Sequence, residues 1–196
     1  MTADEASSTP WLRALQHLAG RVAHEIRNPL NAVAVNLEVV RSRCERGAVE
    51  PPAVLPFATA AAGELERVSR LIDALLALAR PGRNDLATLA GPVITLYDAL
   101  ASAEGGSVSM DLGEPSTGID IAADDARAAL AVTLADMVGP GVAIRVHISG
   151  DSDHVLVRFT GPRVTPSLPV GVRLQSEPSG LTLIFPAQTR SSAETE

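Results

Sequence analysis

The 196-residue sequence has no lysine, one cysteine and few aromatic residues, and each scarcity narrows the range of possible functions. All 16 basic residues are arginines, which excludes mechanisms that need a lysine amine, such as a Schiff base or a Walker-type phosphate lysine. The single cysteine, Cys44, cannot form an internal disulfide, so a reducing compartment is expected. Cys44 lies in the apolar stripe of a predicted helix, where we expect it to be buried.

The sequence also lacks a positive net charge and a clear membrane-spanning run. Its formal net charge is −7, which disfavours nucleic acid and anionic membranes as partners. No apolar run approaches the roughly 20 residues that span a bilayer, and the acidic, polar N-terminal segment does not resemble a signal peptide. We therefore expect a cytoplasmic protein that binds neither nucleic acid nor a membrane.

Apolar residues at helical spacing predict two long helices, over residues 11–46 and 54–80. Gly47 and the pair Pro51-Pro52 are expected to form the short connection between them. Two antiparallel helices of this length cannot cover their own apolar faces. The expected solution is a homodimer in which two hairpins form a four-helix bundle across a two-fold axis.

The second half of the sequence mixes helical periodicity with the alternating pattern of strands. It predicts a small α/β sandwich, with a mostly antiparallel sheet covered by helices on one side, so that the whole chain has an α+β fold. The predicted helices span residues 86–103 and 123–138, and the predicted strands span 107–112, 142–148, 154–159 and 181–185. The predicted division is a disordered tail at 1–10, a helical hairpin at 11–82, an α/β domain at 83–187 and a second disordered tail at 188–196.

The stretch HEIRNPLN, residues 24–31, places a histidine beside a carboxylate and a proline inside the first predicted helix. With Val22 at 0° and about 100° per residue, the apolar stripe spans roughly 0° to 80°. Glu25 flanks the histidine and is placed to orient the imidazole or to accept its proton. The opposite, open face carries His24, Arg27, Asn28 and Asn31, at about 200°, 140°, 240° and 180°.

Two further observations distinguish this face from an ordinary solvated helix surface, which is the alternative interpretation. Pro29 removes a backbone N–H from the middle of the helix at a cost of about 3 kcal/mol, so the resulting bend is expected to serve a purpose. Val35 and Val39 fall on the same open face and form a candidate docking strip for a partner that must reach His24. Isolated apolar residues on a surface are the simpler explanation of the two valines.

Two histidines of the α/β half, His147 and His154, lie near a predicted hairpin turn and could face each other across it. Asp151 and Asp153 lie between them, which is a weak indication of a metal site. A solvated turn stabilised by aspartate side chains is the favoured interpretation, and no metal site is predicted.

The quoted motif carries a specific resemblance. The segment LAGRVAHEIRNPLNAVAVNLEVV (18–40) resembles the phospho-acceptor helix of bacterial two-component sensor histidine kinases, and ELERVSRLIDALLALAR (64–80) resembles the second helix of the same domain. The resemblance covers residues 11–80 and implies that His24 carries a phosphoryl group on a ring nitrogen. It further implies that Glu25 orients the imidazole or acts as its base, that Asn28 positions a hydrolytic water, and that Arg27 and Asn31 shape the surface near the phosphoryl group.

Residues 84–186 resemble a reduced version of the ATP-binding domain that follows in that family, but they depart from its pattern. The loop FTGPRV (159–164) resembles the family's Asp-x-Gly-x-Gly loop, with Phe159 in place of the adenine-binding aspartate and Arg163 in place of the second glycine. The segment 164–180 is too short for the family's lid and further helix. In the helix that would supply an asparagine for Mg²⁺ and phosphates, the neighbourhood is occupied by Thr133, Asp136 and Met137.

The resemblance therefore implies a dimeric histidine phosphotransferase that relays a phosphoryl group between response-regulator receiver domains through His24, without ATP. The chain itself would bind no cofactor, and the receiver would bring its own Mg²⁺. Three alternatives stay open. They are a phosphatase that dephosphorylates the receiver, a non-catalytic pseudokinase that dimerises and sequesters a regulator, and an ATP-dependent kinase with a divergent pocket.

Overall fold

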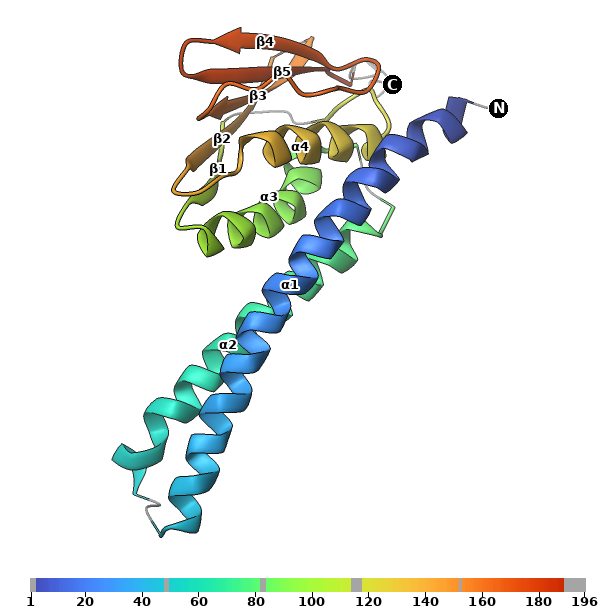
Figure 1. The fold of residues 1–196 in the computed structure, drawn as a ribbon. Coiled ribbons are helices and arrows are strands. Elements are labelled where there is room, and N and C mark those ends of the chain that lie inside the picture. The colour runs from blue at the N-terminus through green and yellow to red at the C-terminus, as the bar shows by residue number, and fades with distance from the viewer. Residues whose placement is uncertain (1–2, 48–49, 82–83, 114–117, 152, 189–196) are drawn as a thin grey trace, which may run out of the picture.

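The computed structural model describes residues 3–47, 50–81, 84–113, 118–151 and 153–188. Figure 1 shows a long helical hairpin that projects from a mixed α/β region, which confirms the predicted α+β fold. The elements are, in chain order, α1 (Ala3–Glu45), α2 (Pro51–Leu78), α3 (Leu86–Ala103), β1 (Ser107–Leu112), α4 (Ala123–Met137), β2 (Ala143–Gly150), β3 (His154–Thr160), β4 (Arg173–Glu177) and β5 (Gly180–Pro186).

The ends of the two long helices differ from the predicted ends. α1 begins at Ala3 rather than Trp11. The segment before Trp11 has no repeating apolar residues, so periodicity could not detect a helix there. Pro51 and Pro52 belong to the first turn of α2 rather than to the connection, because a helix leaves its first N–H groups without intrahelical acceptors. Gly47, at φ 78°, follows the end of α1 as predicted.

Of the predicted terminal tails at 1–10 and 188–196, residues 1–2 and 189–196 lie outside the described residues. The boundary between tail and hairpin at residue 10 stays a prediction. At the other end, Ala187 still pairs with Ile119 in a β-bridge, and the Gln188 N–H donates to the Gly118 carbonyl.

The sheet has the strand order β1-β2-β3-β5-β4, with β1 and β2 parallel and every other pair antiparallel. α4 forms the crossover that a parallel pair requires. Val146, Phe159 and Leu181 are in register on one face of the sheet and are fully or almost fully buried. Strand β4 was missed by sequence reasoning, because this edge strand pairs only with β5 and Leu174 is its one apolar residue.

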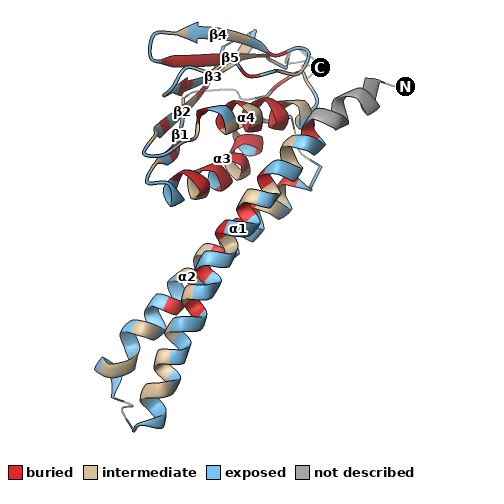
Figure 2. Ribbon diagram, in the orientation of Figure 1, coloured by how far each residue is buried: buried red, intermediate tan, exposed pale blue. Residues whose placement is uncertain are grey.

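Helices α3 and α4 lie between the sheet and the proximal part of the hairpin (Figure 1). Trp11, Leu18 and Val22 of α1 belong to the same buried cluster as Leu130 and Phe159 of the α/β region. Figure 2 accordingly shows the buried residues concentrated in the α/β region and in the part of the hairpin that touches it. The hairpin and the α/β region therefore share one apolar core.

Helix α3 is the one described helix that is long and apolar enough to cross a membrane by length and composition, with a mean hydropathy of 1.3 over Leu86–Ala103. Nine of its residues are buried, including Leu89, Val93 and Leu96, which pack in the core. Its apolar composition is therefore explained by its central place in the α/β region.

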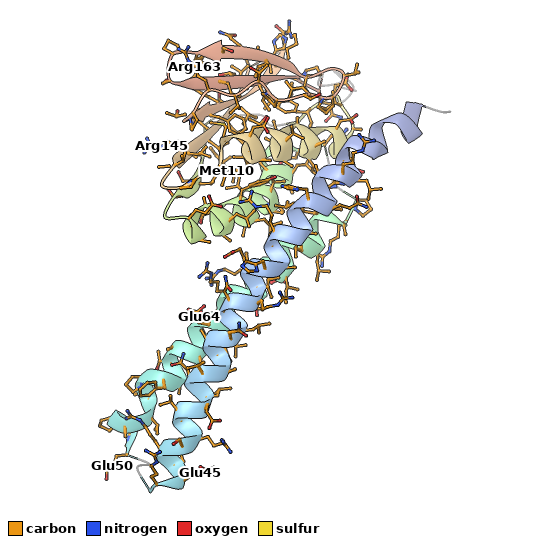
Figure 3. All side chains as sticks on the ribbon, in the orientation of Figure 1. Glu45, Glu50, Glu64, Met110, Arg145 and Arg163 are labelled. Carbon is orange, nitrogen blue, oxygen red and sulfur yellow. The ribbon has the colours of Figure 1, made fainter. Side chains whose placement is uncertain are left out.

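The distal part of the hairpin leaves large apolar side chains exposed. Figure 3 places Glu45 and Glu50 at its tip, at the end far from the sheet. Cys44, predicted to be buried, is exposed, because α2 covers only part of the apolar stripe of α1 within one chain. Five large apolar side chains along the two long helices, here called the hairpin stripe, are 43–52% exposed: Leu30 and Leu37 of α1 and Leu65, Ile72 and Leu76 of α2.

Candidate functional site

The motif at residues 24–31 lies within α1, which continues as a helix through Pro29. Pro29 is buried, and because it has no N–H, the carbonyl of Glu25 loses its usual intrahelical donor. His24, Arg27, Asn28 and Asn31 are all exposed, as their shared helix face predicted. Their catalytic and positioning roles stay predictions at this point.

Glu25 differs from its exposed neighbours, because only 9% of the residue is accessible. The helix geometry predicted that Glu25 lies on the flank of the open face, and in the structure this flank faces α3. A carboxylate that is nearly buried keeps fewer water contacts than a surface carboxylate. A hydrogen bond to a nearby polar group therefore stabilises it more. Glu25 is therefore well placed to interact with the imidazole or with a group bound next to it.

A cavity of about 560 Å³ lies beside His24, between α1 and the C-terminal end of α3. From α1 it is lined by Gly20, Arg21, His24, Glu25 and Asn28, and on the opposite side by Leu100, Ala103 and Glu104. His24 therefore lies in the wall of a cavity that α3 borders, and not on an isolated helix. This volume is within the range of sites that hold a small group.

A second cavity, of about 620 Å³, continues along the hairpin toward α2 and shares Glu25, Asn28 and Ala103 with the first. Its wall includes Glu64, labelled in Figure 3 part-way along α2, together with Arg67 and Arg70. Because Asn28 and Glu25 line both cavities, these two residues border the whole groove beside His24.

The ion pair Arg21–Glu104 crosses the first cavity. The Arg21 Nη2 donates to the Glu104 Oε1 at 3.2 Å, and the two side chains are 31% and 37% exposed. Sequence reasoning missed both residues. Arg21 is one turn before His24, a spacing that helix geometry makes visible, but no pattern in the sequence indicates that Glu104 lies opposite.

Val35 and Val39, the candidate docking strip, are not part of this groove. Val35 is 64% exposed and Val39 is half-buried at a shallow hollow with Glu38 and Arg43. At a rise of about 1.5 Å per residue, they lie roughly 16 Å and 22 Å along α1 from His24. A surface that uses both the histidine and the valines would therefore have to extend along the helix.

At the positions predicted to correspond to ATP-binding elements, the side chains are either buried in the core or exposed at the surface. Phe159 is fully buried in the sheet core, and the buried Thr133 donates its hydroxyl to the Ala129 carbonyl at 2.8 Å. Met137 is also buried, whereas Asp136 is exposed. Arg163 is exposed and donates to the Pro178 carbonyl at 3.2 Å, and Figure 3 shows it at the outer side of the sheet.

The two histidines of the sheet do not face each other. His147 is opposite Asp111 of β1, with 3.2 Å between its Nδ1 and the carboxylate, while the Nε2 of His154 lies 2.7 Å from the Arg173 guanidinium. Asp151 accepts the backbone N–H groups of Asp153 and His154, which holds the pKa of Asp151 below its ordinary value. Among the described residues, no group of three or more His, Cys, Asp or Glu side chains lies where it could hold a metal ion.

Several solved structures of histidine kinases are similar to this chain. The kinase ThkA, solved in complex with the response regulator TrrA, has a TM-score of 0.41 and 16% identity over 90% of this chain and 63% of that chain. AdeS of Acinetobacter baumannii has a TM-score of 0.40 and 12% identity, over 85% of this chain and 98% of that chain. A histidine kinase of Burkholderia phymatum has a TM-score of 0.38 and 13% identity, over 87% of this chain and 97% of that chain.

Comparison with curated protein sequences gives no match. A family match covers the hairpin, where residues 14–84 match the family described as the His Kinase A (phospho-acceptor) domain. The matched segment contains His24, the groove residues of α1 and all of α2. Residues 14–84 therefore match a phospho-acceptor domain of the histidine kinase type.

Proposed function

We propose that this chain is a histidine phosphotransferase that accepts a phosphoryl group on His24 from a response-regulator receiver domain and passes it to another. The observation that carries the proposal is the contrast within one chain. An exposed histidine lies in an intact phospho-acceptor motif beside an open groove, while the α/β region is filled at the position where a kinase would read adenine.

The transfer is a displacement at phosphorus. A neutral ring nitrogen of His24 attacks the aspartyl phosphate of the receiver, the phosphorus–oxygen bond to the aspartate breaks, and the carboxylate leaves with the bonding electrons. The proton on the other ring nitrogen passes to Glu25 or to water, which leaves a neutral phosphohistidine. Transfer to a second receiver runs the same steps in reverse.

The absence of ATP from this scheme rests on Phe159 and its surroundings. Phe159 occupies the place of an adenine-binding carboxylate and is fully buried between Val146 and Leu181 in the sheet register. A buried ring without hydrogen-bonding atoms cannot read an adenine amino group. The chain would bind no cofactor of its own, and the receiver would supply the Mg²⁺ that stabilises the transferring group.

The active form would be a homodimer. The hairpin stripe of Leu30, Leu37, Leu65, Ile72 and Leu76 leaves large apolar side chains exposed along both helices. Contiguous apolar surface of this kind marks an interface, and a second hairpin related by a two-fold axis would cover it with the same residues. The open face with His24 lies away from this stripe and stays available.

The receiver would dock on the open face of α1. The ThkA structure contains a response regulator, and we infer the same class of partner for this chain. Val35 would add apolar contact to such an interface, because a side chain that is 64% exposed gains when water is removed from it.

The test is transfer of label from a receiver domain that carries radiolabelled phosphoaspartate, with radiolabelled ATP in a separate reaction. We expect label on the wild type from the receiver and none from ATP. His24→Ala should lose the label, and His17→Ala should keep it, because His17 is an exposed histidine of the same helix about two turns earlier. No His24-dependent label from any receiver of the same organism would overturn the relay, and label from ATP would restore the kinase alternative.

A phosphatase that acts on the receiver is the second candidate, and the position of Asn28 favours it. Asn28 lies one turn after His24 and lines both cavities, where its carboxamide could hold a water against an aspartyl phosphate. Asn28→Ala should then slow receiver dephosphorylation by about tenfold or more while label still reaches His24. Unchanged dephosphorylation by Asn28→Ala would remove this candidate. Full biological activity of His24→Ala would instead indicate a non-catalytic regulator-binding role.

A further inference from the structure

The ion pair Arg21–Glu104 lies where a phosphoryl group on His24 would arrive. Arg21 and His24 are three residues apart on α1, which places their Cβ atoms about 5–6 Å apart, and both line the same cavity as Glu104. Among the described residues of this lining, Arg21 is the one cation, facing the carboxylates of Glu25 and Glu104. The cavity beside the histidine therefore starts with more negative than positive charge.

Phosphorylation of His24 would increase the excess of negative charge in this cavity. A phosphoryl group carries close to two negative charges at neutral pH, and it would share the cavity with two carboxylates. A guanidinium binds phosphate oxygens in a bidentate arrangement that it matches in shape. The Arg21–Glu104 pair is partly exposed, with a single contact at 3.2 Å, so it is a weak competitor for the same guanidinium.

The backbone of Glu104 is anchored within the α/β region, and its side chain pairs with Arg21 of α1. It caps the C-terminal end of α3, and its carbonyl accepts the Gly141 N–H at 2.9 Å. A carboxylate at this end of a helix is disfavoured by the helix dipole. The backbone position of Glu104 is therefore fixed. Without Arg21, its carboxylate would be in an unfavourable electrostatic environment.

We propose that Arg21 is a phosphoryl-positioning residue whose guanidinium leaves Glu104 for the phosphoryl group on His24, so that phosphorylation breaks the ion pair between the end of α3 and α1. This inference rests on the proposed phosphorylation of His24. It gives the α/β region a role that needs no nucleotide, because its contact with the hairpin reports whether His24 is phosphorylated. The phosphorylated and unphosphorylated chains would then present different surfaces to a receiver.

The two partners of the ion pair give opposite predictions, which a purely structural role would not. Arg21→Gln removes the cation that holds the phosphoryl group, and loss of a charged hydrogen bond should shorten the phosphohistidine lifetime by about tenfold. Glu104→Gln frees Arg21 and removes a repelling carboxylate, so it should lengthen that lifetime. Arg21→Lys keeps the charge and should recover part of the loss.

The experiment uses the full chain with phosphoramidate, a small donor that does not depend on a receiver. Phosphohistidine is followed by phosphorus NMR, with His24→Ala to confirm the site, and amide hydrogen exchange is measured at the C-terminal turn of α3. We expect phosphorylation to speed exchange there in the wild type, and Glu104→Gln to show fast exchange already without phosphate. Arg41→Gln is the matched control, since Arg41 also pairs with a carboxylate of α1, Glu38, at 2.7 Å and lies about 25 Å from His24.

The proposal is overturned if Arg21→Gln matches Arg41→Gln in phosphohistidine lifetime, if both partners of the ion pair change it in the same direction, or if Arg27→Gln alone produces the loss. The proposed relay fails separately, when the chain takes label from phosphoramidate but from no receiver.

Discussion

The α/β region and the distal half of the hairpin bury their apolar side chains to very different extents. In the α/β region, Phe159, Leu183 and Phe185 are fully buried within one chain. In the distal hairpin, Leu37 and Leu65 stay about half exposed, and Figure 2 shows how little of this part is buried. The comparison indicates that one region is completed by its own chain, whereas the other is completed by a second copy.

The first test removes an aromatic ring from the completed region. Phe159→Ala should lower the free energy of unfolding by about 3–5 kcal/mol, because it leaves a cavity in the sheet core. Leu156→Ala is the control on the opposite, half-buried face of the same strand, and it should cost about 1 kcal/mol. Urea unfolding followed by circular dichroism measures both. Similar losses for the two variants would mean that Phe159 is not a core residue.

The second test adds a charge to the hairpin stripe. Ile72→Glu should weaken dimerisation by about three orders of magnitude, because about 2 kcal/mol of apolar burial is lost in each of two chains. The control is Leu55→Glu, an exposed apolar residue of α2 that lies about 100° further around the helix. Sedimentation equilibrium reports the association. Equal weakening by both substitutions, or a monomeric wild type, would contradict the dimer.

The third test is the joint between the two regions. Arg127 of α4 is 5% exposed, and it donates to the Arg80 carbonyl just beyond α2 and to Asp124, each at 3.0 Å. Arg127→Ala should lower the free energy of unfolding by about 2 kcal/mol through the loss of these charged hydrogen bonds.

Arg127→Met provides the matched comparison, because it keeps much of the volume and removes the Nε, which is buried without a hydrogen-bond partner among the described residues. It should be less destabilising than Arg127→Ala. A methionine variant less stable than the alanine variant would argue against this account of the joint.

The smallest effect concerns pH. The Thr182 hydroxyl donates to Glu177 at 2.5 Å, and this bond, followed by Arg158, lowers the pKa of Glu177. Because the folded pKa is depressed, the stabilisation is present above the ordinary glutamate pKa of about 4.3 and is lost as the pH falls through the lower folded value. The stability difference between wild type and Thr182→Val should therefore shrink below about pH 4. A difference that stays constant into acid would show that Glu177 does not contribute.

The sequence predicted the hairpin, four of the five strands and the open face of His24, since each depends on a repeating pattern along one element. Strand β4 escaped detection because an exposed edge strand has no apolar alternation. The burial of Cys44 was predicted wrongly because a helical stripe does not say which chain covers it. Arg21 and Glu104 are 83 residues apart, and only the packing of α3 against α1 brings them together.

Trp11, Leu18 and Val22 lie near the start of α1, yet they pack in the core of the α/β region. A cut at residue 82 would therefore leave bare apolar surface on both fragments, although the hairpin and the sheet look separable in sequence. The contacts of α1 instead tie the two regions into one cooperative unit, and denaturation should remove the helix beside His24 and the sheet in a single transition. A destabilising substitution in the core of the sheet would then also lower the folded fraction of the helix that carries His24, without touching the site itself.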